Sequence, residues 1–269
     1  MPKFFITSDD LLLDQAHSVI KGALIRGRDV HHIRHVLRLK AGDEITINCD
    51  GTMDLRARID TISASEVRLQ VLEQLSPPFQ NKNPITLVQA IPKHAKMDLI
   101  LQKATELGAD DIIPLASSRS FVNEHRAVSE GRLSRWQKIC QEAAKQCGRS
   151  TIPNLHSPIQ FPALCRMATE EQNILPLFLW EKEQHRNLKS VLTQYKEAPD
   201  NEASDNEASD NVVRKIFILV GPEGGFSEEE VQLALQAGFI PISCAPWILR
   251  TETAALYALS AIQYELNFP

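Results

Sequence analysis

Apolar and polar residues alternate in short runs over the first part of the chain, which is typical of β-strands. The expected strands are Glu44–Cys49, Leu55–Ile62 and Val67–Leu72. The Asp50-Gly51 pair after the first of them is a hairpin turn signal. A short helix is expected over His31–Leu37, with Asp29 as its N-cap. The pattern predicts a small β-rich domain over residues 1–75.

The pattern changes after Ser76-Pro77-Pro78, and residues 76–84 are expected to form a linker. Beyond it, apolar runs of strand length alternate with segments of helical periodicity. In Lys96–Leu107 the apolar residues share one helical face, and Gly108 stands at the expected stop. The other expected strands are Ile85–Ile91, Asp111–Leu115, Ile174–Trp180, Lys215–Val220 and Ile240–Cys244, and the other helices are Ser129–Cys147, Glu228–Ala237 and Glu252–Leu266. Such alternation predicts an α/β domain over residues 85–269, with a mostly parallel sheet covered on both faces.

An acidic tandem repeat interrupts this domain, because Asn201–Asp205 is followed by the same five residues in Asn206–Asp210. The surrounding segment 199–211 has no large apolar residue and is predicted to be a disordered surface insertion. A duplication that the fold tolerates is favoured over a functional acidic tail. The segment holds five of the 34 acids, so the rest of the chain balances its 29 Lys and Arg residues despite the net charge of -5.

Other features exclude several classes of protein. No apolar run approaches the roughly 18–20 residues needed to span a bilayer, and the N-terminus does not resemble a secretory signal. The five cysteines are scattered, odd in number and without a C-x-x-C pair, which argues against a structural zinc site and a disulfide framework. Reduced thiols in a cytoplasmic protein are the expectation.

The stretch Leu219–Val231 is the most informative part of the sequence. Its glycines follow a buried strand at the carboxyl end, where open α/β sheets usually bind ligands. Ser227 and Glu230 form a capping box, and Phe226 with Val231 can form the hydrophobic staple beside it. The glycines of this turn are Gly221, Gly224 and Gly225. The start of the helix is therefore well defined, and the glycine turn is expected to be rigid.

The ligand of this turn is not expected to be a phosphate. Neither G-x-G-x-x-G nor the P-loop pattern is present, and acidic residues crowd the start of the helix. These acids are Glu223, Glu228, Glu229 and Glu230. They favour a neutral or cationic ligand such as S-adenosylmethionine, which has no phosphate and carries a sulfonium and an ammonium. A plain strand-to-helix turn is the alternative.

A second informative stretch is Ser243–Ala254, a loop that leads into a helix with alanines at helical spacing. Small residues at that spacing permit close helix approach, either within the fold or across a dimer. Arg250 and Glu252 are charged groups at the strand-to-helix junction, where buried structural roles are uncommon.

Together, G-P-E-G-G-F-S-x-x-E and I-L-R-T-E-T-A resemble the RsmE family of 16S ribosomal RNA (uracil-N3)-methyltransferases, which belongs to the SPOUT class. The likeness extends to His32–Arg38, in that family's PUA-like N-terminal domain, and to Lys96–Gly108 and Glu142–Arg149. It covers nearly the whole chain apart from the acidic insertion.

The resemblance implies a PUA-like RNA-binding domain, a trefoil-knotted SPOUT domain, S-adenosylmethionine as cofactor and a homodimer that acts on 16S rRNA of the small ribosomal subunit. It implies no metal and no membrane. The implied cofactor-binding residues are Leu179, Trp180, Glu181, Leu219, Val220, Gly221, Pro222, Glu223, Gly224, Gly225, Ala245, Ile248, Leu249, Arg250 and Thr253. The chain departs from the family's usual Leu-Gly-Pro-Arg at Ala245, which adds a methyl group, and at Trp247, which removes a positive charge.

The methyl group on a sulfonium is already activated, so the protein mainly positions donor and acceptor. The hypothesis is that Arg250 stabilises the negative charge that develops on a uracil oxygen, while Glu223 or Glu252 helps to remove the N3 proton. The alternative for Arg250 is an ion pair with one of these two glutamates that shapes the loop.

Two basic clusters are the expected RNA contacts, since such clusters usually track phosphates. The candidate residues are Arg26, Arg28, His32, Arg34, Arg38, Arg119 and Arg149. Solvated surface charges are the alternative. His31 and His35 lie one helical turn apart, but surface or RNA-facing histidines are favoured over a metal site. Cys244 is expected to be a core residue rather than a covalent nucleophile.

Two rival functions stay open. One is a SPOUT enzyme that methylates another RNA or a ribose 2′-oxygen, and the other is a non-catalytic RNA-binding protein with the same fold. Calorimetry with S-adenosylmethionine separates them, because a pure binding module should give no heat of binding.

Overall fold

A computed structural model describes residues 1–14, 19–76, 79–93, 95–120, 128–171, 173–197 and 215–267. The chain forms two compact units: an N-terminal unit of residues 1–80 and 141–152, and a C-terminal unit of residues 81–140 and 153–269. Residues 141–152 thus group with the N-terminal unit, although the sequence suggested a division within residues 76–84. The acidic insertion lies outside the described residues.

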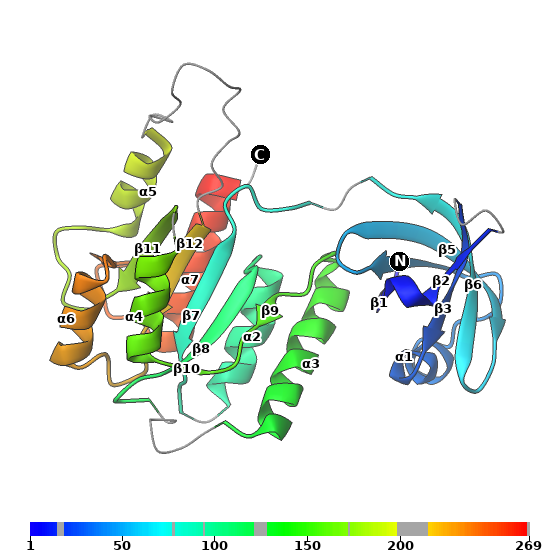
Figure 1. Cartoon of the computed structure of the whole chain (residues 1–269), viewed down its shortest axis with the longest axis horizontal. Coiled ribbons are helices and arrows are strands. Elements are labelled where there is room, and N and C mark those ends of the chain that lie inside the picture. The colour runs from blue at the N-terminus through cyan, green and yellow to red at the C-terminus, as the bar shows by residue number, and fades with distance from the viewer. Residues whose placement is uncertain are drawn as a thin grey trace. The chain divides into compact units, whose positions relative to one another are not determined.

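The N-terminal unit is built on one six-stranded sheet with the order β1-β4-β5-β6-β3-β2, in which only β1 and β4 pair in parallel (Figure 1). Its strands are β1 (Lys3–Ile6), β2 (Leu11–Leu13), β3 (Ile20–Arg26), β4 (Glu44–Cys49), β5 (Met53–Ile62) and β6 (Glu66–Gln74). Asp50 and Gly51 both have positive φ, at 49° and 74°, and turn the chain from β4 into β5 as predicted.

The predicted helix of this unit begins earlier and has a different cap. Helix α1 spans Arg28–His31 and continues directly into a π-helical turn, η2, over His32–Val36. Its N-cap is Gly27, whose φ of 70° suits a residue without a Cβ. Asp29 lies in the first turn, and its carboxylate accepts a hydrogen bond from the Lys145 ammonium at 2.7 Å. The prediction of Asp29 as the N-cap is therefore wrong.

A buried ion pair attaches residues 148–150 to this sheet. The Lys3 ammonium donates to Asp54 Oδ2 at 2.9 Å, to the Gly148 carbonyl at 3.0 Å and to Ser150 Oγ at 3.0 Å. Burial alone would raise the pKa of Asp54, but hydrogen bonds from Ser150, Asn48 and Lys3 outweigh it and lower that pKa. The segment that carries Arg149 is thereby fixed to the N-terminal unit.

The C-terminal unit is a parallel sheet with the order β10-β8-β7-β12-β11-β13, and β9 pairs with β8 (Figure 1). Its strands are β7 (Ile85–Ala90), β8 (Asp111–Ala116), β9 (Asn154–Leu155), β10 (Ile159–Gln160), β11 (Ile174–Leu179), β12 (Lys215–Val220) and β13 (Ile240–Ile242). Its helices are α2 (Lys96–Glu106), α3 (Glu130–Cys147, whose end groups with the N-terminal unit), α4 (Phe161–Glu170), α5 (Leu188–Glu197), α6 (Glu228–Gln236) and α7 (Thr251–Ile262), which continues into η3 (Gln263–Asn267). The predicted α/β class is confirmed.

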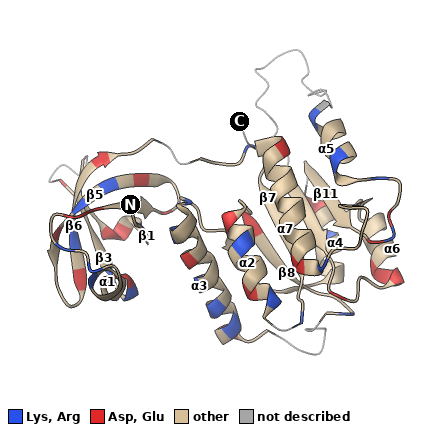
Figure 2. Cartoon of the chain, turned by 180° about the vertical axis from the view of Figure 1, so that it is seen from behind, with Lys and Arg blue, Asp and Glu red and all other residues tan. Residues whose placement is uncertain are grey.

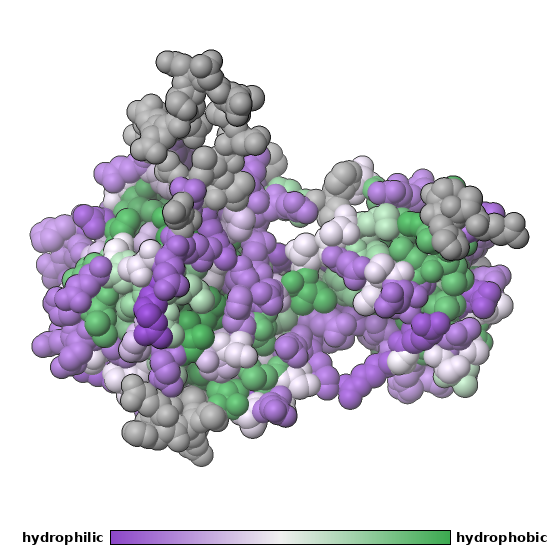
Figure 3. Space-filling view, viewed as in Figure 1, coloured by the Kyte–Doolittle hydropathy of each residue, from purple (hydrophilic) through white to green (hydrophobic). Residues whose placement is uncertain are grey.

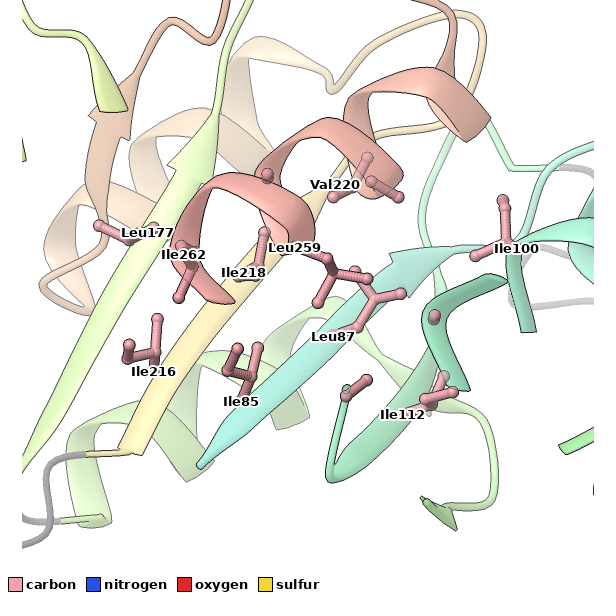
Figure 4. Close-up of a cluster of buried hydrophobic side chains, with 14 of the residues drawn as sticks. Ile85, Leu87, Ile100, Ile112, Leu177, Ile216, Ile218, Val220, Leu259 and Ile262 are labelled. Carbon is pink, nitrogen blue, oxygen red and sulfur yellow. The ribbon is translucent and has the colours of Figure 1, made fainter. Parts of the chain in front are cut away.

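Both faces of this sheet are covered, as the mostly apolar, buried central strands require. All six residues of β7 are buried. Helices α2, α5 and α7 pack on one face, where Leu87, Ile218 and Leu259 meet in the cluster of Figure 4. Helices α4 and α6 pack on the other face around Phe178 and Phe217. Hydrophilic side chains cover most of the surface in Figure 3, with smaller apolar patches between them.

The last part of the chain returns to the middle of the sheet. After β13, the Ser243 N–H donates to the Arg186 carbonyl at 2.9 Å, and the Leu188 N–H donates to the Ser243 carbonyl at 3.0 Å. The chain then runs beside the loop that follows β11 before α7 packs on β7 and β12. These contacts place the loop that leads into α7 beside the loop that follows β11. No helix in the described ranges is long and apolar enough to cross a membrane.

Candidate functional site

The carboxyl ends of β11, β12 and β13 surround a pocket of about 920 Å³ within the C-terminal unit. Three segments contribute most of its wall: the loop after β11, the glycine turn of residues 221–225 and the loop of residues 243–250 before α7. The carboxyl edge of a parallel sheet is the usual place for a ligand in such folds.

The glycine turn requires its glycines at two positions. A Cβ on Gly221 would lie 3.0 Å from the buried ring of Phe226. Gly225 has a φ of +66°, and a Cβ there would lie 2.9 Å from Glu181 Oε1. The Arg119 guanidinium donates to the Gly224 carbonyl at 2.9 Å. The turn is therefore in contact with the Phe226 ring, the Arg119 guanidinium and the Glu181 carboxylate.

The helix after the turn begins as the sequence indicates. Ser227 Oγ accepts the Glu230 N–H at 3.2 Å, and Glu230 Oε2 accepts the Ser227 N–H at 2.9 Å. The same carboxylate accepts the Ser118 N–H at 2.7 Å and the Ser118 hydroxyl at 3.0 Å. Phe226 and Val231 pack in one core cluster. The capping box thus also ties the start of α6 to the loop after β8.

Thr251 joins the two predicted turns. Its hydroxyl donates to the Gly221 carbonyl at 2.6 Å and accepts the side-chain N–H of Gln89 at 3.0 Å. Gln89 is fully buried in the central strand β7, and Thr251 is 6% exposed. A hydrogen bond between such buried groups is costly to lose, so the glycine turn and the start of α7 form one wall.

Lys96, the first residue of α2, connects the two carboxylates that the sequence singled out. Its ammonium lies 3.0 Å from Glu223 Oε1 and 3.2 Å from Glu252 Oε2. The hydrogen bond with Glu223 raises the pKa of Lys96. Burial would raise the pKa of Glu223, but hydrogen bonds from its own backbone, Lys96 and the Lys93 N–H lower it. Glu223 is therefore charged at neutral pH and a weak base.

Arg250 is exposed at the N-cap of α7 and lines the same pocket. Its carbonyl accepts the Ala254 N–H at 2.8 Å, while its side chain makes no capping hydrogen bond. Among the described residues Arg250 forms no ion pair, and Lys96 holds the two glutamates instead. The alternative in which Arg250 pairs with Glu223 or Glu252 is not what the structure shows.

Most of the implied cofactor residues line this pocket. They are Leu179, Trp180, Glu181, Val220, Gly221, Pro222, Glu223, Gly224, Gly225, Ala245, Ile248, Leu249 and Arg250. Leu219 does not, because it alternates to the other side of β12 and is fully buried in the core. Thr253 is exposed on α7 and lies outside the lining.

Several lining residues were not among the implied cofactor residues, including Lys96, Glu183, Gln184, Phe226, Thr251 and Ala254. Lys96 opened a recognised motif, but nothing local to that motif identified its partners. A single glutamine in the apolar run of β7 was the one sequence signal for the Thr251 contact.

The chemistry of the wall suits a ligand with positive charge. Glu181, Glu183 and Glu223 line the pocket, against Lys96 and Arg250. Two backbone N–H groups, from His185 and Arg186, lower the pKa of Glu183 and keep its carboxylate charged. Within the described residues no group of three or more His, Cys, Asp or Glu could hold a metal ion. Burial raises the pKa of Cys244 to about 12, so its thiol is not a nucleophile at neutral pH.

The candidate RNA contacts lie in both units. In the N-terminal unit Arg26, Arg28, Arg34 and Arg38 are exposed, and His32 is half-buried with its ring edge-on to Phe4. Arg26 pairs with Asp10 at 3.0 Å, and the half-buried Arg149 donates to Thr151 Oγ1 at 3.2 Å. Figure 2 also shows basic residues along α3. Arg119 lies beside the glycine turn, where its guanidinium donates to the Gly224 carbonyl.

Comparison with known proteins agrees with this arrangement. Residues 79–263 match the RNA methyltransferase domain family, and residues 25–52 match the RNA methyltransferase PUA domain. The ribosomal RNA small subunit methyltransferase E of Bacillus subtilis is 29% identical over 265 residues, which cover 98% of this chain and 97% of that protein. Its namesake from Buchnera aphidicola subsp. Schizaphis graminum is 30% identical over 239 residues and 88% of each chain.

A solved structure extends the match to three dimensions. Ribosomal RNA small subunit methyltransferase E from Neisseria gonorrhoeae, bound to S-adenosyl methionine, gives a TM-score of 0.78 at 28% identity and covers 98% of this chain and 97% of that chain. The domain match spans more than half of this sequence, and the relatives align along nearly all of it. The chain therefore belongs to the ribosomal RNA small subunit methyltransferase E family.

Proposed function

We propose that this protein transfers the methyl group of S-adenosylmethionine to N3 of a specific uridine in 16S ribosomal RNA of the small subunit. The observation that carries the proposal is the Thr251–Gly221 hydrogen bond of 2.6 Å, which joins the two family motifs into one pocket wall. The names of the relatives and the cofactor in the Neisseria gonorrhoeae structure support the same activity. The reaction would take place in the cytoplasm.

The pocket fits the cofactor by charge and by shape. Glu228, Glu229 and Glu230 occupy the first turn of α6, so the helix start that would attract a phosphate repels it. Glu181 and Glu183 offer carboxylates to the sulfonium and ammonium groups, and the glycine turn lets a ligand approach the backbone closely. Leu219, which the resemblance also implied, has its side chain buried in the core and would act only through backbone atoms, and Thr253 lies outside the pocket lining.

When bound, S-adenosylmethionine supplies a methyl group that is already activated for transfer. The protein then has to orient the uracil and stabilise the charge that forms as N3 loses its proton. Arg250 suits the second task because its guanidinium is exposed and makes no ion pair within the described residues. The lowered pKa of Glu223 weakens it as a base. The other proposed proton acceptor is Glu252, whose carboxylate also lies 3.2 Å from the Lys96 ammonium.

RNA would be held by basic side chains at its phosphates. The proposed contacts are Arg26, Arg28, His32, Arg34, Arg38, Arg119 and Arg149. The target base must be unpaired or flipped out, because N3 lies on its pairing edge. A homodimer is also proposed, because Tyr257 and Tyr264 leave 47% and 78% of their surface exposed along α7 and η3. Sedimentation of the purified protein tests it.

The test of the activity is mass spectrometry of small-subunit RNA from a deletion strain, with and without the restored gene. Loss and recovery of 3-methyluridine in 16S RNA are expected. A missing 2′-O-methyl nucleoside or a change in another RNA would identify the rival enzyme instead. If no nucleoside changes and calorimetry shows no heat with S-adenosylmethionine, the protein is a binding module and the proposal fails.

A further inference from the structure

Lys96 contacts two acids from separate parts of the chain. Glu223 belongs to the glycine turn and Glu252 to the first turn of α7, and both carboxylates lie within 3.2 Å of the same ammonium. All three side chains are largely shielded, with 29%, 29% and 16% of their surfaces exposed for Lys96, Glu223 and Glu252. Two carboxylates this close repel each other unless a cation lies between them.

Arg250 is the cation nearest in sequence to this cluster. It stands two residues before Glu252 and lines the same pocket as Glu223, yet within the described residues it pairs with neither. A guanidinium binds a carboxylate in two parallel hydrogen bonds and would be an effective partner for either acid. In the structure, Lys96 already holds both acids.

We infer that Lys96 is a positioning residue: by occupying Glu223 and Glu252 it keeps the Arg250 guanidinium unpaired and available for the charge that develops on the substrate base. The inference rests on the proposed function for the identity of that base. Backbone geometry favours the same arrangement, because the Lys93 N–H also holds the Glu223 carboxylate, with both oxygens at 3.3 Å. The raised pKa of Lys96 keeps the ammonium charged at any physiological pH.

The experiment compares four variants with the wild-type protein. Lys96→Met removes the charge and keeps an apolar stem, and Lys96→Arg keeps the charge. Lys96→Met combined with Glu223→Gln removes one of the acids that would capture Arg250. Lys103→Met is the matched control, because Lys103 lies on the same helix and its ion pair joins only Glu106 at 2.9 Å.

Two quantities are measured for each variant. One is kcat for methyl transfer to small-subunit RNA, and the other is the rate at which phenylglyoxal modifies Arg250, followed by mass spectrometry of its peptide. A partly exposed ion pair contributes up to about 1 kcal/mol, so Lys96→Met should lower both by roughly two- to fivefold. The fold-changes in kcat and in the modification rate should agree, because both report the unpaired fraction of Arg250. Lys96→Arg and Lys103→Met should keep the wild-type values. The double variant should recover part of the loss in both quantities, because Glu252 remains.

The inference is overturned if Lys96→Met lowers kcat while Arg250 reacts at its wild-type rate, or if Glu223→Gln recovers neither quantity. A general loss of packing would lower kcat without slowing the modification of an exposed arginine. If the wild-type protein transfers no methyl group, the proposed function fails, and the modification rates still decide the role of Lys96 by themselves.

Discussion

The two turns that line the pocket are held very differently. The glycine turn is fixed by the Arg119 bond to Gly224, by the ion pair of Glu223 and by the capping box that follows it. The loop of residues 243–250 is anchored at its two ends, by Ser243 and by Thr251. Between these anchors, Trp247 and Ile248 leave 70% and 80% of their surfaces exposed.

This difference suggests how the work of the site is divided. A wall that is already fixed can bind a small ligand without an ordering cost, which suits a cofactor pocket. A loop that presents large apolar side chains to solvent is typical of a surface that a partner molecule covers. We expect changes in the glycine turn to act on cofactor affinity, and changes in the second loop to act on catalysis and on the larger partner.

The largest expected effect comes from Arg250→Ala. Loss of one preorganised group that stabilises developing charge costs about 10²–10³ in kcat. The side chain takes no part in capping α7, so stability and the affinity for S-adenosylmethionine should change little. Steady-state kinetics and calorimetry measure the two effects separately. Arg166→Ala, an exposed arginine on α4, is the control for lost charge. Full activity in Arg250→Ala would remove the catalytic assignment.

A second effect is expected where Thr251 joins the two turns. Thr251→Val keeps the shape of the side chain but leaves the Gly221 carbonyl and the Gln89 amide without their shared partner. An unsatisfied buried polar group costs about 1–3 kcal/mol, and we expect that loss of stability in denaturant unfolding, together with weaker cofactor binding. Thr251→Ser keeps the hydroxyl and should recover both. If Thr251→Val weakens neither, the two turns do not act as one wall.

Gly225→Ala is expected to act on the glycine turn alone. A left-handed φ costs a residue with a Cβ about 1–2 kcal/mol, and here the new methyl group would also press on Glu181. Gly238→Ala is a close control, because Gly238 has a φ of +85° and open space around its Cα. Both variants should lose stability, but only Gly225→Ala should bind the cofactor more weakly. Each 1.4 kcal/mol of strain that the bound turn cannot relieve should lower the affinity about tenfold. Equal affinities in calorimetry would place the cofactor elsewhere.

Much of the C-terminal fold could be predicted, because its strands and helices differ in periodicity. Helix α2 ends within a residue of its predicted end, and β12 has the predicted bounds. The first strands were missed because Leu11–Leu13 and Ile20–Arg26 do not alternate cleanly. Helices α4 and α5 were also missed, although the buried apolar residues of each stand at helical spacing.

The site shows the same limit. The glycine turn was visible because its glycines and the capping box are local signals. The partner of Glu223 and Glu252 was not, because Lys96 lies about 130 residues from the first and still further from the second, and only the packing of α2 against α7 brings them together. Thr251 was missed for a similar reason, since its hydrogen bonds reach back to Gln89 in β7.

The smallest effect on the isolated protein is expected from Trp247→Ala. An exposed side chain with little packing contributes within about 0.5 kcal/mol to stability, so unfolding and cofactor binding should barely change. The effect should appear instead in the KM for small-subunit RNA or in the sedimentation of the proposed dimer, because an indole buried by a partner contributes strongly to binding. Trp247→Phe keeps an aromatic ring, so its effect on the KM or on the sedimentation should lie between those of the wild-type protein and Trp247→Ala.

Trp247→Arg sharpens the comparison further, because it restores the charge that the family usually has at this position. If the loop provides an apolar contact here, Trp247→Arg should weaken partner binding as Trp247→Ala does. If only general attraction to RNA is needed, the arginine should restore the KM and increase its dependence on salt. A large loss of stability in Trp247→Ala would contradict the proposed difference between the two turns. It would mean that the exposed loop is held as firmly as the glycine turn.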